Sequence, residues 1–304
     1  MEYVLTTEGL SKKYKHGFAL NGLSMHVPKG VIYGFVGRNG AGKTTVIRLI
    51  SGLQTPTSGE YTLFGKKGTD REIGKSRRRM GVMFETPSLY LHMTAEENLK
   101  HQYRVLGITS FDGITDILNM VGLSNTGKKK VKHFSIGMQK RLSIAVALCG
   151  DPDFLILDEP LNGLDPQGIV QIRELLLKLN REKQVTVLVS GHILEELSKL
   201  ATHYGFVDNG CIVKEISAKE LEASSKKCVT TEVSDVKVLA RILDEKGAEY
   251  TVLSETSVEI FDEISITELV HRLEAEGCEL KRVTEREATL EYYYISLVGG
   301  KEYE

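Results

Sequence analysis

The chain has 304 residues, of which 41% are hydrophobic and 26% are charged, and its formal net charge is −2. This length and composition predict about two ordinary globular domains. The near-neutral charge argues against a broad surface for nucleic acid or an anionic membrane. No apolar run approaches the roughly 18–20 residues of a membrane helix, and the N-terminus lacks the features of a signal peptide. The four cysteines lack metal-ligand spacing, so we expect reduced thiols in a cytoplasmic protein.

The first part of the chain is predicted to form strands separated by turns. Alternating apolar residues indicate two strands with Tyr14 in a polar loop between them. The apolar run at residues 31–36 is typical of a buried strand. The other strands expected in this part lie at 3–9, 23–27, 60–64 and 80–84.

The middle of the chain changes to a helical pattern. Between Thr94 and Cys149 apolar residues recur at helical spacing, and Thr94 with Glu97 forms a capping box. Beyond this region strands and helices alternate, which predicts an α/β fold with a mostly parallel sheet. An all-helical subdomain, at about residues 87–150, is then inserted into that fold. The elements expected after it are a strand at 154–158, a helix at 166–181 and a strand at 185–190.

The C-terminal part follows a polar segment, residues 217–227, which predicts a short helix and a linker. Its pattern has the order βαββαβ and then a last helix, which indicates a small ferredoxin-like α+β domain. We therefore expect one domain at 1–220 and a second at 228–304. The second carries no catalytic motif, and a packing, dimerisation or regulatory role is open. Its expected strands lie at 228–233, 249–254, 257–261 and 279–283, and its helices at 235–246, 266–276 and 287–297.

A glycine-rich motif restricts the function most. The pattern G-x-x-x-x-G-K-T lies between an expected strand and an expected helix, and therefore predicts a phosphate-binding P-loop. Backbone N–H groups and the positive end of the helix hold phosphate in such a loop. Lys43 would reach the β- and γ-phosphates, Thr44 would bind Mg²⁺, and Thr45 would support the loop or touch the α-phosphate. The predicted nucleotide-binding residues are Gly37, Arg38, Asn39, Gly40, Ala41, Gly42, Lys43, Thr44 and Thr45.

Two further sites complete the predicted chemistry. Asp158 and Glu159 end the apolar strand at 154–158, where Asp158 would hold Mg²⁺ through water and Glu159 would be the general base. Ser135 and Gly137 open a helix and predict a second phosphate site. Since one P-loop does not need two such sites, we expect two chains to meet head-to-tail, each covering the nucleotide of the other.

These motifs resemble those of the ATP-binding subunit of ABC transporters over residues 2–220. GRNGAGKTT is similar to the Walker A motif of that family, FSIGMQ to its signature loop, FLILDEP to Walker B, GLDP to the D-loop and SGH to the switch histidine. The resemblance implies a P-loop NTPase ABC ATPase fold with an antiparallel β subdomain, and ATP and Mg²⁺ as cofactors. It implies ATP hydrolysis coupled to transport through a separate transmembrane permease. The partner in the dimer would be the same chain or a close homologue.

The resemblance also implies roles for single residues. Ser135 and Gly137 would bind the γ-phosphate of the partner's ATP, and Asp165 would link the two sites. His192 would contact the γ-phosphate within its own chain, and Tyr14 would stack on adenine. Taken alone, His192 is more often a cap or core histidine and Tyr14 an ordinary surface residue. Attachment to the permease would hold the protein at the inner face of the cell membrane.

Two positions depart from the family pattern. Glu85 stands where the family usually has Gln, which senses Mg²⁺ and the membrane partner; a carboxylate can ligate Mg²⁺ or accept from water but cannot donate as an amide does. Ile136 replaces the usual Gly or Ser of the signature loop. Glu85 and the tail from Ala288 to Gly300 resemble the bacterial branch that exports peptide antibiotics, of the bacitracin and lantibiotic-immunity types. Glu85 is also open to interpretation as a neutral replacement.

Two alternatives belong to other classes. A soluble ABC ATPase acting on DNA or ribosomes would carry a coiled coil, zinc motifs or a second cassette, and this sequence shows none of them. The charge of the chain also disfavours nucleic acid. A kinase-like P-loop enzyme would not explain the signature loop. The predicted function is therefore the ATPase subunit of an exporter, with no nucleic-acid partner.

Overall fold

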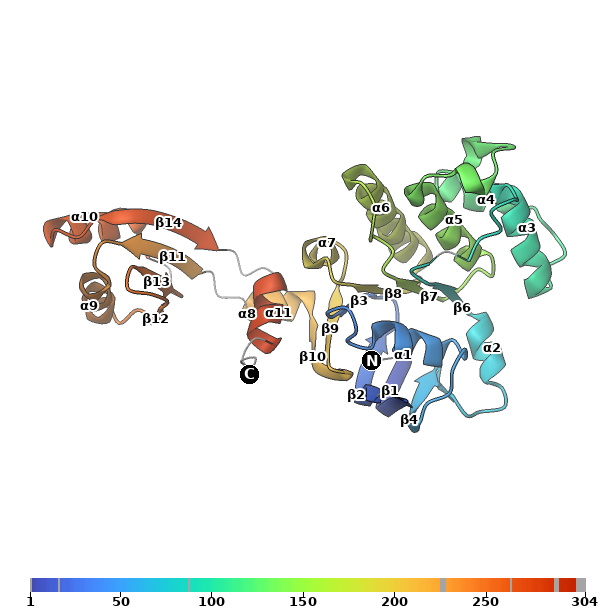
Figure 1. The fold of residues 1–304 in the computed structure, drawn as a ribbon, viewed down its shortest axis with the longest axis horizontal. Coiled ribbons are helices and arrows are strands. Elements are labelled where there is room, and N and C mark those ends of the chain that lie inside the picture. The colour runs from blue at the N-terminus through green and yellow to red at the C-terminus, as the bar shows by residue number, and fades with distance from the viewer. Residues whose placement is uncertain are drawn as a thin grey trace. The chain divides into compact units, whose positions relative to one another are not determined.

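The computed structural model describes residues 2–15, 17–86, 88–224, 228–262, 264–286 and 290–298. The chain divides into two compact units, Met1–Ala218 and Lys219–Glu304 (Figure 1). Each unit has its own apolar core. Every helix in the described ranges is too short or too polar to span a bilayer.

A six-stranded sheet with the order β10-β9-β3-β8-β7-β6 lies at the centre of the first unit. Its strands are β3 (Ile32–Val36), β6 (Met80–Met83), β7 (Phe154–Asp158), β8 (Thr186–Gly191), β9 (His203–Asp208) and β10 (Cys211–Ser217). All neighbouring strands are parallel except β10, which is antiparallel to β9. Every residue of β3, β7 and β8 is buried, as expected for parallel strands covered on both faces. The carboxyl ends of these strands meet at one edge, where Asp158 pairs with Ser190.

A second, antiparallel sheet has the order β2-β1-β4-β5. It consists of β1 (Tyr3–Tyr14), β2 (Gly17–Pro28), β4 (Ser58–Leu63) and β5 (Lys66–Lys67). The predicted polar loop around Tyr14 is wrong, because β1 and β2 remain paired as far as Tyr14 and Gly17. Register shifts interrupt this ladder at several points. Each shift breaks the alternation of apolar and polar residues while the pairing continues, so the pattern underestimates the strands.

Helix α1 (Lys43–Ile50) connects the cores beneath the two sheets. Its side chains Val46 and Ile47 belong to one apolar cluster with Leu5 and Leu10 of β1 and Phe35 of β3, and all of these are fully buried. A helix fixed in this way between two sheets holds its first turn at the carboxyl edge of the parallel sheet. The P-loop lies at that turn.

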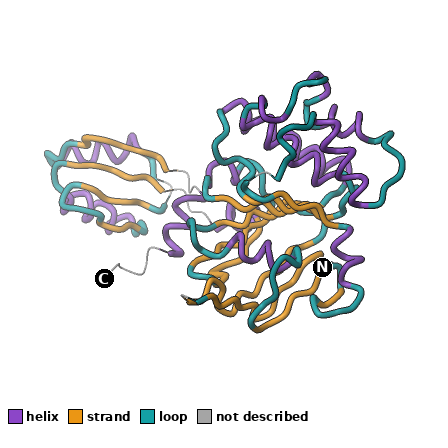
Figure 2. Tube along the Cα trace, turned by 45° about the vertical axis from the view of Figure 1, so that its right-hand side comes forward, coloured by secondary structure: helices purple, strands orange, loops and turns teal. Residues whose placement is uncertain are grey.

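The predicted helical insert is present on one side of the parallel sheet (Figure 2). It contains α3 (Ala95–Leu106), α4 (Ile114–Met120) and α5 (Ile136–Leu148), while residue 87, where the insert was expected to begin, lies outside the described residues. The capping box before α3 is confirmed: the Thr94 hydroxyl accepts from the N–H of Glu97 at 3.1 Å, and the Glu97 carboxylate accepts from the N–H of Thr94 at 2.6 Å. The other helices of this unit are α2 (Ile73–Arg78), α6 (Pro166–Lys183) and α7 (Leu194–Ser198).

The second unit contains the predicted βαββαβ order, in an antiparallel sheet with the order β12-β13-β11-β14. Its strands are β11 (Cys228–Val233), β12 (Tyr250–Val252), β13 (Ser257–Ile260) and β14 (Leu280–Arg286), and its helices are α9 (Val236–Lys246) and α10 (Ile266–Ala275). Leu239 and Leu243 of α9 and Leu273 of α10 pack with the strands in a separate core. Helices α8 (Ala218–Ser224) and α11 (Leu290–Val298) flank this domain in the sequence. Of the tail that carries part of the resemblance, residues 288–289 and 299–300 lie outside the described residues.

Candidate functional site

The P-loop follows β3 and requires glycine at two positions for different reasons. A Cβ at Gly37 would lie 2.5 Å from the carbonyl oxygen of Val207, which no side chain can tolerate. Gly42 has φ +106°, and its Cβ would lie 2.6 Å from the Leu20 side chain. Gly40 also has a positive φ, +85°, in open space. The loop can therefore curl tightly enough for its backbone to surround a phosphate.

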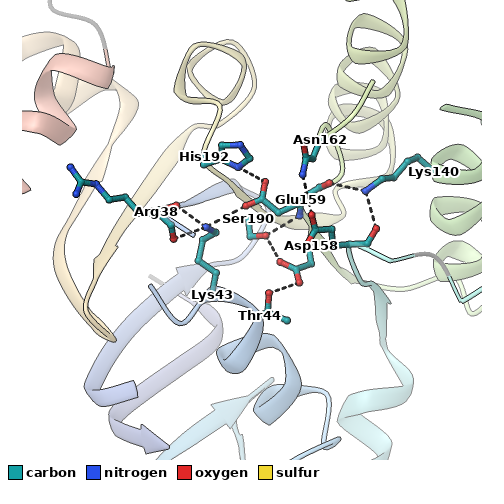
Figure 3. A network of polar contacts seen from close by, with 11 residues as sticks. Arg38, Lys43, Thr44, Lys140, Asp158, Glu159, Asn162, Ser190 and His192 are labelled. Atoms are coloured by element: carbon teal, nitrogen blue, oxygen red, sulfur yellow. Dashed lines mark hydrogen bonds and ion pairs between the residues drawn. The ribbon is translucent and has the colours of Figure 1, made fainter. Parts of the chain in front are cut away.

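Lys43 lies in the mouth of this loop (Figure 3). Its ammonium donates to the carbonyl oxygens of Gly37 at 2.6 Å and Arg38 at 3.2 Å, and it lies 3.3 Å from a carboxylate oxygen of Glu159. The side chain of Lys43 is only 6% exposed. The side chain of Arg38 points away from this cluster, so its backbone rather than its guanidinium is part of the loop (Figure 3).

Asp158 joins three elements at the edge of the sheet. The Thr44 hydroxyl of α1 donates to its Oδ2 at 2.8 Å, and the Ser190 hydroxyl of β8 donates to its Oδ1 at 2.6 Å. Asp158 is 1% exposed, so these two hydrogen bonds orient a buried carboxylate. Two of the three residues predicted to bind Mg²⁺, Thr44 and Asp158, are therefore in direct contact, while the third, Glu85, lines the same P-loop cavity as Thr44.

Glu159 lies between Lys43 and His192 (Figure 3). Its Oε2 is 3.0 Å from His192 Nδ1, and its Oε1, which faces Lys43, accepts no hydrogen bond among the described residues. The backbone of Glu159 is left-handed, with φ +49°, and its N–H donates to the Ser190 hydroxyl at 3.0 Å. A carboxylate that is 7% exposed and has one unsatisfied oxygen can accept a proton from a water molecule placed beside it.

Glu85 reaches the same site from the bend after β6. Its carboxylate accepts from the Asn162 side-chain amide at 3.0 Å, and its backbone carbonyl accepts from the Lys140 ammonium at 3.0 Å. Glu85 lines an open cavity of ≈ 260 Å³ together with the P-loop and Glu159. The other residues of this cavity are Ala19, Asn39, Gly40, Gly42, Lys43, Thr44 and Thr45.

The second predicted phosphate site lies apart from the first. Ser135 and Gly137 line a cavity of ≈ 380 Å³ with Asp165, and none of these three residues lines the P-loop cavity. Ser135 caps the N-terminus of α5 and Asp165 caps that of α6, so both cap side chains are held by backbone N–H groups. Ile136, which departs from the family pattern, is 60% exposed at this surface.

Tyr14 is not among the residues that line the P-loop cavity. Its hydroxyl donates to the Gln54 side chain, the Lys12 ammonium lies 5.6 Å from its ring centroid, and the residue is 40% exposed. Stacking on adenine stays a prediction. Ala19, three residues after the β1–β2 turn, lines the P-loop cavity and was not predicted from the sequence.

The sequence also gave no role to Lys140 and Asn162. Lys140 is 4% exposed on α5; burial lowers the pKa of its ammonium, and the charges of Glu85, Glu159 and Asp158 oppose that change. The only available signal was that Lys140 lies within the stretch FSIGMQKRL, next to the signature loop. Nothing in a local pattern indicates that a lysine at this position is buried.

Comparison with known proteins agrees with this geometry. Residues 20–162 match the family described as ABC transporter. The chain is 38% identical to the bacitracin transport ATP-binding protein BcrA of Enterococcus faecalis, over 99% of this chain and 98% of that protein. It is 40% identical to the lantibiotic transport ATP-binding protein SrtF of Streptococcus pyogenes, over 73% of this chain and 93% of that protein.

Solved structures show the same fold. The structure of cbiO1 from Clostridium perfringens, part of an ABC transporter complex, has a TM-score of 0.65 at 25% identity, over 81% of this chain and 96% of that chain. A dimeric ATP-binding cassette bound to ADP and Pi has a TM-score of 0.64 at 26% identity, over 70% of this chain and 98% of that chain. Sequence, fold and site lead to the same conclusion: the chain belongs to the family of ABC transporter ATP-binding proteins, which are ATPases.

Proposed function

We propose that this chain supplies the energy for the export of a peptide antibiotic or a similar drug through a separate membrane permease. The names of its bacitracin and lantibiotic transport relatives support this assignment over a role on DNA or ribosomes. The P-loop would hold the phosphates of ATP, and Tyr14 would stack on the adenine. The single observation that carries the hydrolytic part of the proposal is the position of the Glu159 carboxylate, between Lys43 and His192 at the P-loop cavity.

Hydrolysis would proceed by attack of water on the γ-phosphorus, whose bond to the bridging oxygen breaks so that ADP leaves and inorganic phosphate forms. Lys43 would bind the β- and γ-phosphate oxygens and so leave its contact with Glu159, whose freed carboxylate would then orient and deprotonate the water. His192 would hold the other carboxylate oxygen and contact the γ-phosphate. These roles use the distances of 3.3 Å and 3.0 Å that join Glu159 to its two neighbours.

The residues around Asp158 fit Mg²⁺. A threonine hydroxyl and a carboxylate oxygen 2.8 Å apart are hard oxygen ligands of the kind that this ion takes together with phosphate oxygens and water. Thr44 and Asp158 would hold the ion, Asp158 through water, and Glu85, which lines the same cavity as Thr44, would be a further ligand. When bound, Mg²⁺ neutralises charge on the phosphates.

Two copies, or this chain and a close homologue, would meet head-to-tail. The support is that Ser135, Gly137 and Asp165 line a cavity of their own, with capped helix N-termini, apart from the P-loop cavity. Ser135 and Gly137 would contact the γ-phosphate of the partner's ATP. Asp165, beside them, would link the two sites.

A membrane permease would be the second partner. The helical insert, which connects Glu85 to the signature loop, would carry the docking surface and convert the nucleotide state into rotation of the transmembrane helices. The chain would then be cytoplasmic and attached to the inner face of the membrane only through the permease. The C-terminal ferredoxin-like domain is left with a packing, dimerisation or regulatory role.

The test is Glu159→Gln. Glutamine preserves the shape of the side chain but is not a base, so ATP binding and ATP-dependent dimerisation should persist while turnover falls by about 10²–10⁴. Hydrolysis at the parental rate in the variant would contradict the role of Glu159 as the base. Co-purification of a polytopic membrane protein would support export, whereas ribosomes or DNA would support the alternative.

A further inference from the structure

Lys140 connects the signature helix to the two acidic segments of the hydrolytic site. It lies on α5 one turn after Gly137, and its ammonium donates to the backbone carbonyls of Glu85 and Glu159, each at 3.0 Å (Figure 3). Its contacts are therefore with the chain that carries the carboxylates, rather than with the carboxylates themselves. These two hydrogen bonds fix the backbone positions from which the Glu85 and Glu159 side chains extend.

The backbone that Lys140 holds is unusual. Glu159 has φ +49°, a conformation that residues with a side chain adopt only where neighbours stabilise it. Its N–H donates to Ser190, and its carbonyl accepts from Lys140 at 3.0 Å and from the N–H of Asn162 at 3.4 Å. The direction of the Glu159 side chain thus depends on hydrogen bonds made on both sides of that residue.

The same contacts form a closed ring. Lys140 bonds to Glu85 and Glu159, the Asn162 backbone bonds to Glu159, and the Asn162 side chain bonds to the Glu85 carboxylate at 3.0 Å. The ring joins the bend after β6, the end of β7 and helix α5. A shift of α5 therefore moves two walls of the P-loop cavity together.

Burying the Lys140 ammonium costs desolvation free energy. An ammonium that is 4% exposed loses most of its hydration, and an apolar side chain of similar length would fill the space without that loss. The hydrogen bonds that Lys140 donates are what an apolar side chain cannot provide. Their target is the backbone of the proposed base.

We propose that Lys140 is a positioning residue that couples the signature helix to the base of the same chain. The inference rests on the head-to-tail arrangement proposed above, in which Ser135 and Gly137 contact the nucleotide of the partner. When the signature loop binds that nucleotide, α5 is held in a fixed position. Lys140 then keeps the backbone of Glu159 in the left-handed conformation that directs its carboxylate toward the water. Each site then senses occupancy of the other through one side chain.

The first experiment replaces Lys140 by methionine, which preserves length and apolar volume but removes the donors. Because a small displacement of a catalytic group costs up to about 10²-fold, kcat should fall about 10- to 100-fold while the KM for ATP changes less than about twofold. Lys140→Gln, which keeps an N–H donor, should recover part of kcat. Lys178→Met, on the exposed surface of α6, is the matched control and should leave both constants unchanged.

The second experiment is a double-mutant cycle with Glu159→Gln. If Lys140 acts through Glu159, Lys140→Met should lower the residual rate of that variant much less than it lowers the parental rate. ATP-dependent dimerisation of Glu159→Gln should also survive the added change. Equal losses in both backgrounds, or a raised KM with parental kcat in either Lys140 variant, would overturn the inference.

The same variants distinguish a failure to fold, a failure of the proposed base and a failure of the role given to Lys140. Thermal melts show whether Lys140→Met is folded; if it is not, a folded Lys140→Gln decides: a kcat below the parental value at unchanged KM supports positioning, and a raised KM with parental kcat refutes it. A parental rate in Glu159→Gln would refute the base itself. A parental rate in Lys140→Met beside an inactive Glu159→Gln would refute only the role of Lys140.

Discussion

His192 Nδ1 lies 3.0 Å from Oε2 of Glu159, at the carboxyl ends of the neighbouring strands β8 and β7. The pair places a titratable ring against the proposed base, while the other carboxylate oxygen faces Lys43. Because β7 and β8 are adjacent and parallel, the contact follows from the sheet itself. The histidine can therefore hold the base without support from a flexible loop.

Replacement of His192 by alanine should lower kcat about 100-fold, in the range of a lost acid–base or orienting group, with little change in ATP binding. Steady-state kinetics and nucleotide-binding titrations measure the two quantities. His271→Ala, on the surface of the second unit, is the control. A His192→Ala protein with parental kcat would show that Glu159 needs no histidine.

Ser190→Ala should affect both stability and turnover. The hydroxyl donates to Asp158 and accepts from the N–H of Glu159, both buried, so its loss should cost about 1–3 kcal/mol of unfolding free energy. Chemical denaturation measures this cost. Ser143→Ala removes a hydroxyl whose bond stays within α5, and should change stability and kcat much less. Similar losses in the two variants would mean that the serine network is not specific to the site.

Gly42→Ala should prevent normal P-loop formation. It combines a φ of +106° with a Cβ placed 2.6 Å from Leu20 and 2.7 Å from the Ala19 carbonyl oxygen. Gly65→Ala has a comparable positive φ, +74°, but no heavy atom within 4 Å, and should cost only the backbone strain of about 1–3 kcal/mol. Calorimetry and ATP-binding assays on both variants separate strain from collision. Equal stability of the two would rule out the collision.

Glu85→Gln tests the departure from the family pattern. Glutamine can still accept from the Asn162 amide through its side-chain oxygen, and the contact of Lys140 is with the backbone, so the local structure should persist. We expect kcat within about tenfold of the parent and unchanged thermal stability, since no hydrogen bond is lost. A loss of kcat beyond 100-fold would show that the carboxylate itself is required.

Cys149 should make the protein less stable in alkali. Burial raises the pKa of its thiol from 9.0 to about 12. Below pH 9 the folded and unfolded states both hold the proton; between pH 9 and about 12 only the folded state does, so stability falls as pH rises, with a slope of up to about 1.4 kcal/mol per pH unit. Denaturation of the parent and of Cys149→Ala across this range should give a steeper loss for the parent. Parallel curves would contradict a buried thiol.

Local patterns in the sequence determined the parallel strands, the P-loop and the βαββαβ domain. An apolar run, a glycine spacing or a capping box depends on neighbours a few residues away, and the elements they predicted are present as β3, β7, α3 and the β12-β13-β11-β14 sheet of the second unit. The carboxylates Asp158 and Glu159 could be placed near the P-loop because parallel strands of one sheet end at one edge, although β8 lies between β3 and β7. The hairpin that ends at Tyr14 was missed because register shifts disturb the alternation on which strand prediction depends.

Only the tertiary structure decided how the site is held. Lys140 meets the backbone of Glu85, 55 residues away in the sequence, and no local pattern distinguishes this lysine from a solvated one. The left-handed backbone of Glu159 and its support by Ser190 are likewise products of packing between β7, β8 and α5. The sequence determines which groups can do the chemistry, because composition and spacing are local; their orientation depends on contacts between distant segments that exist only once the chain has folded.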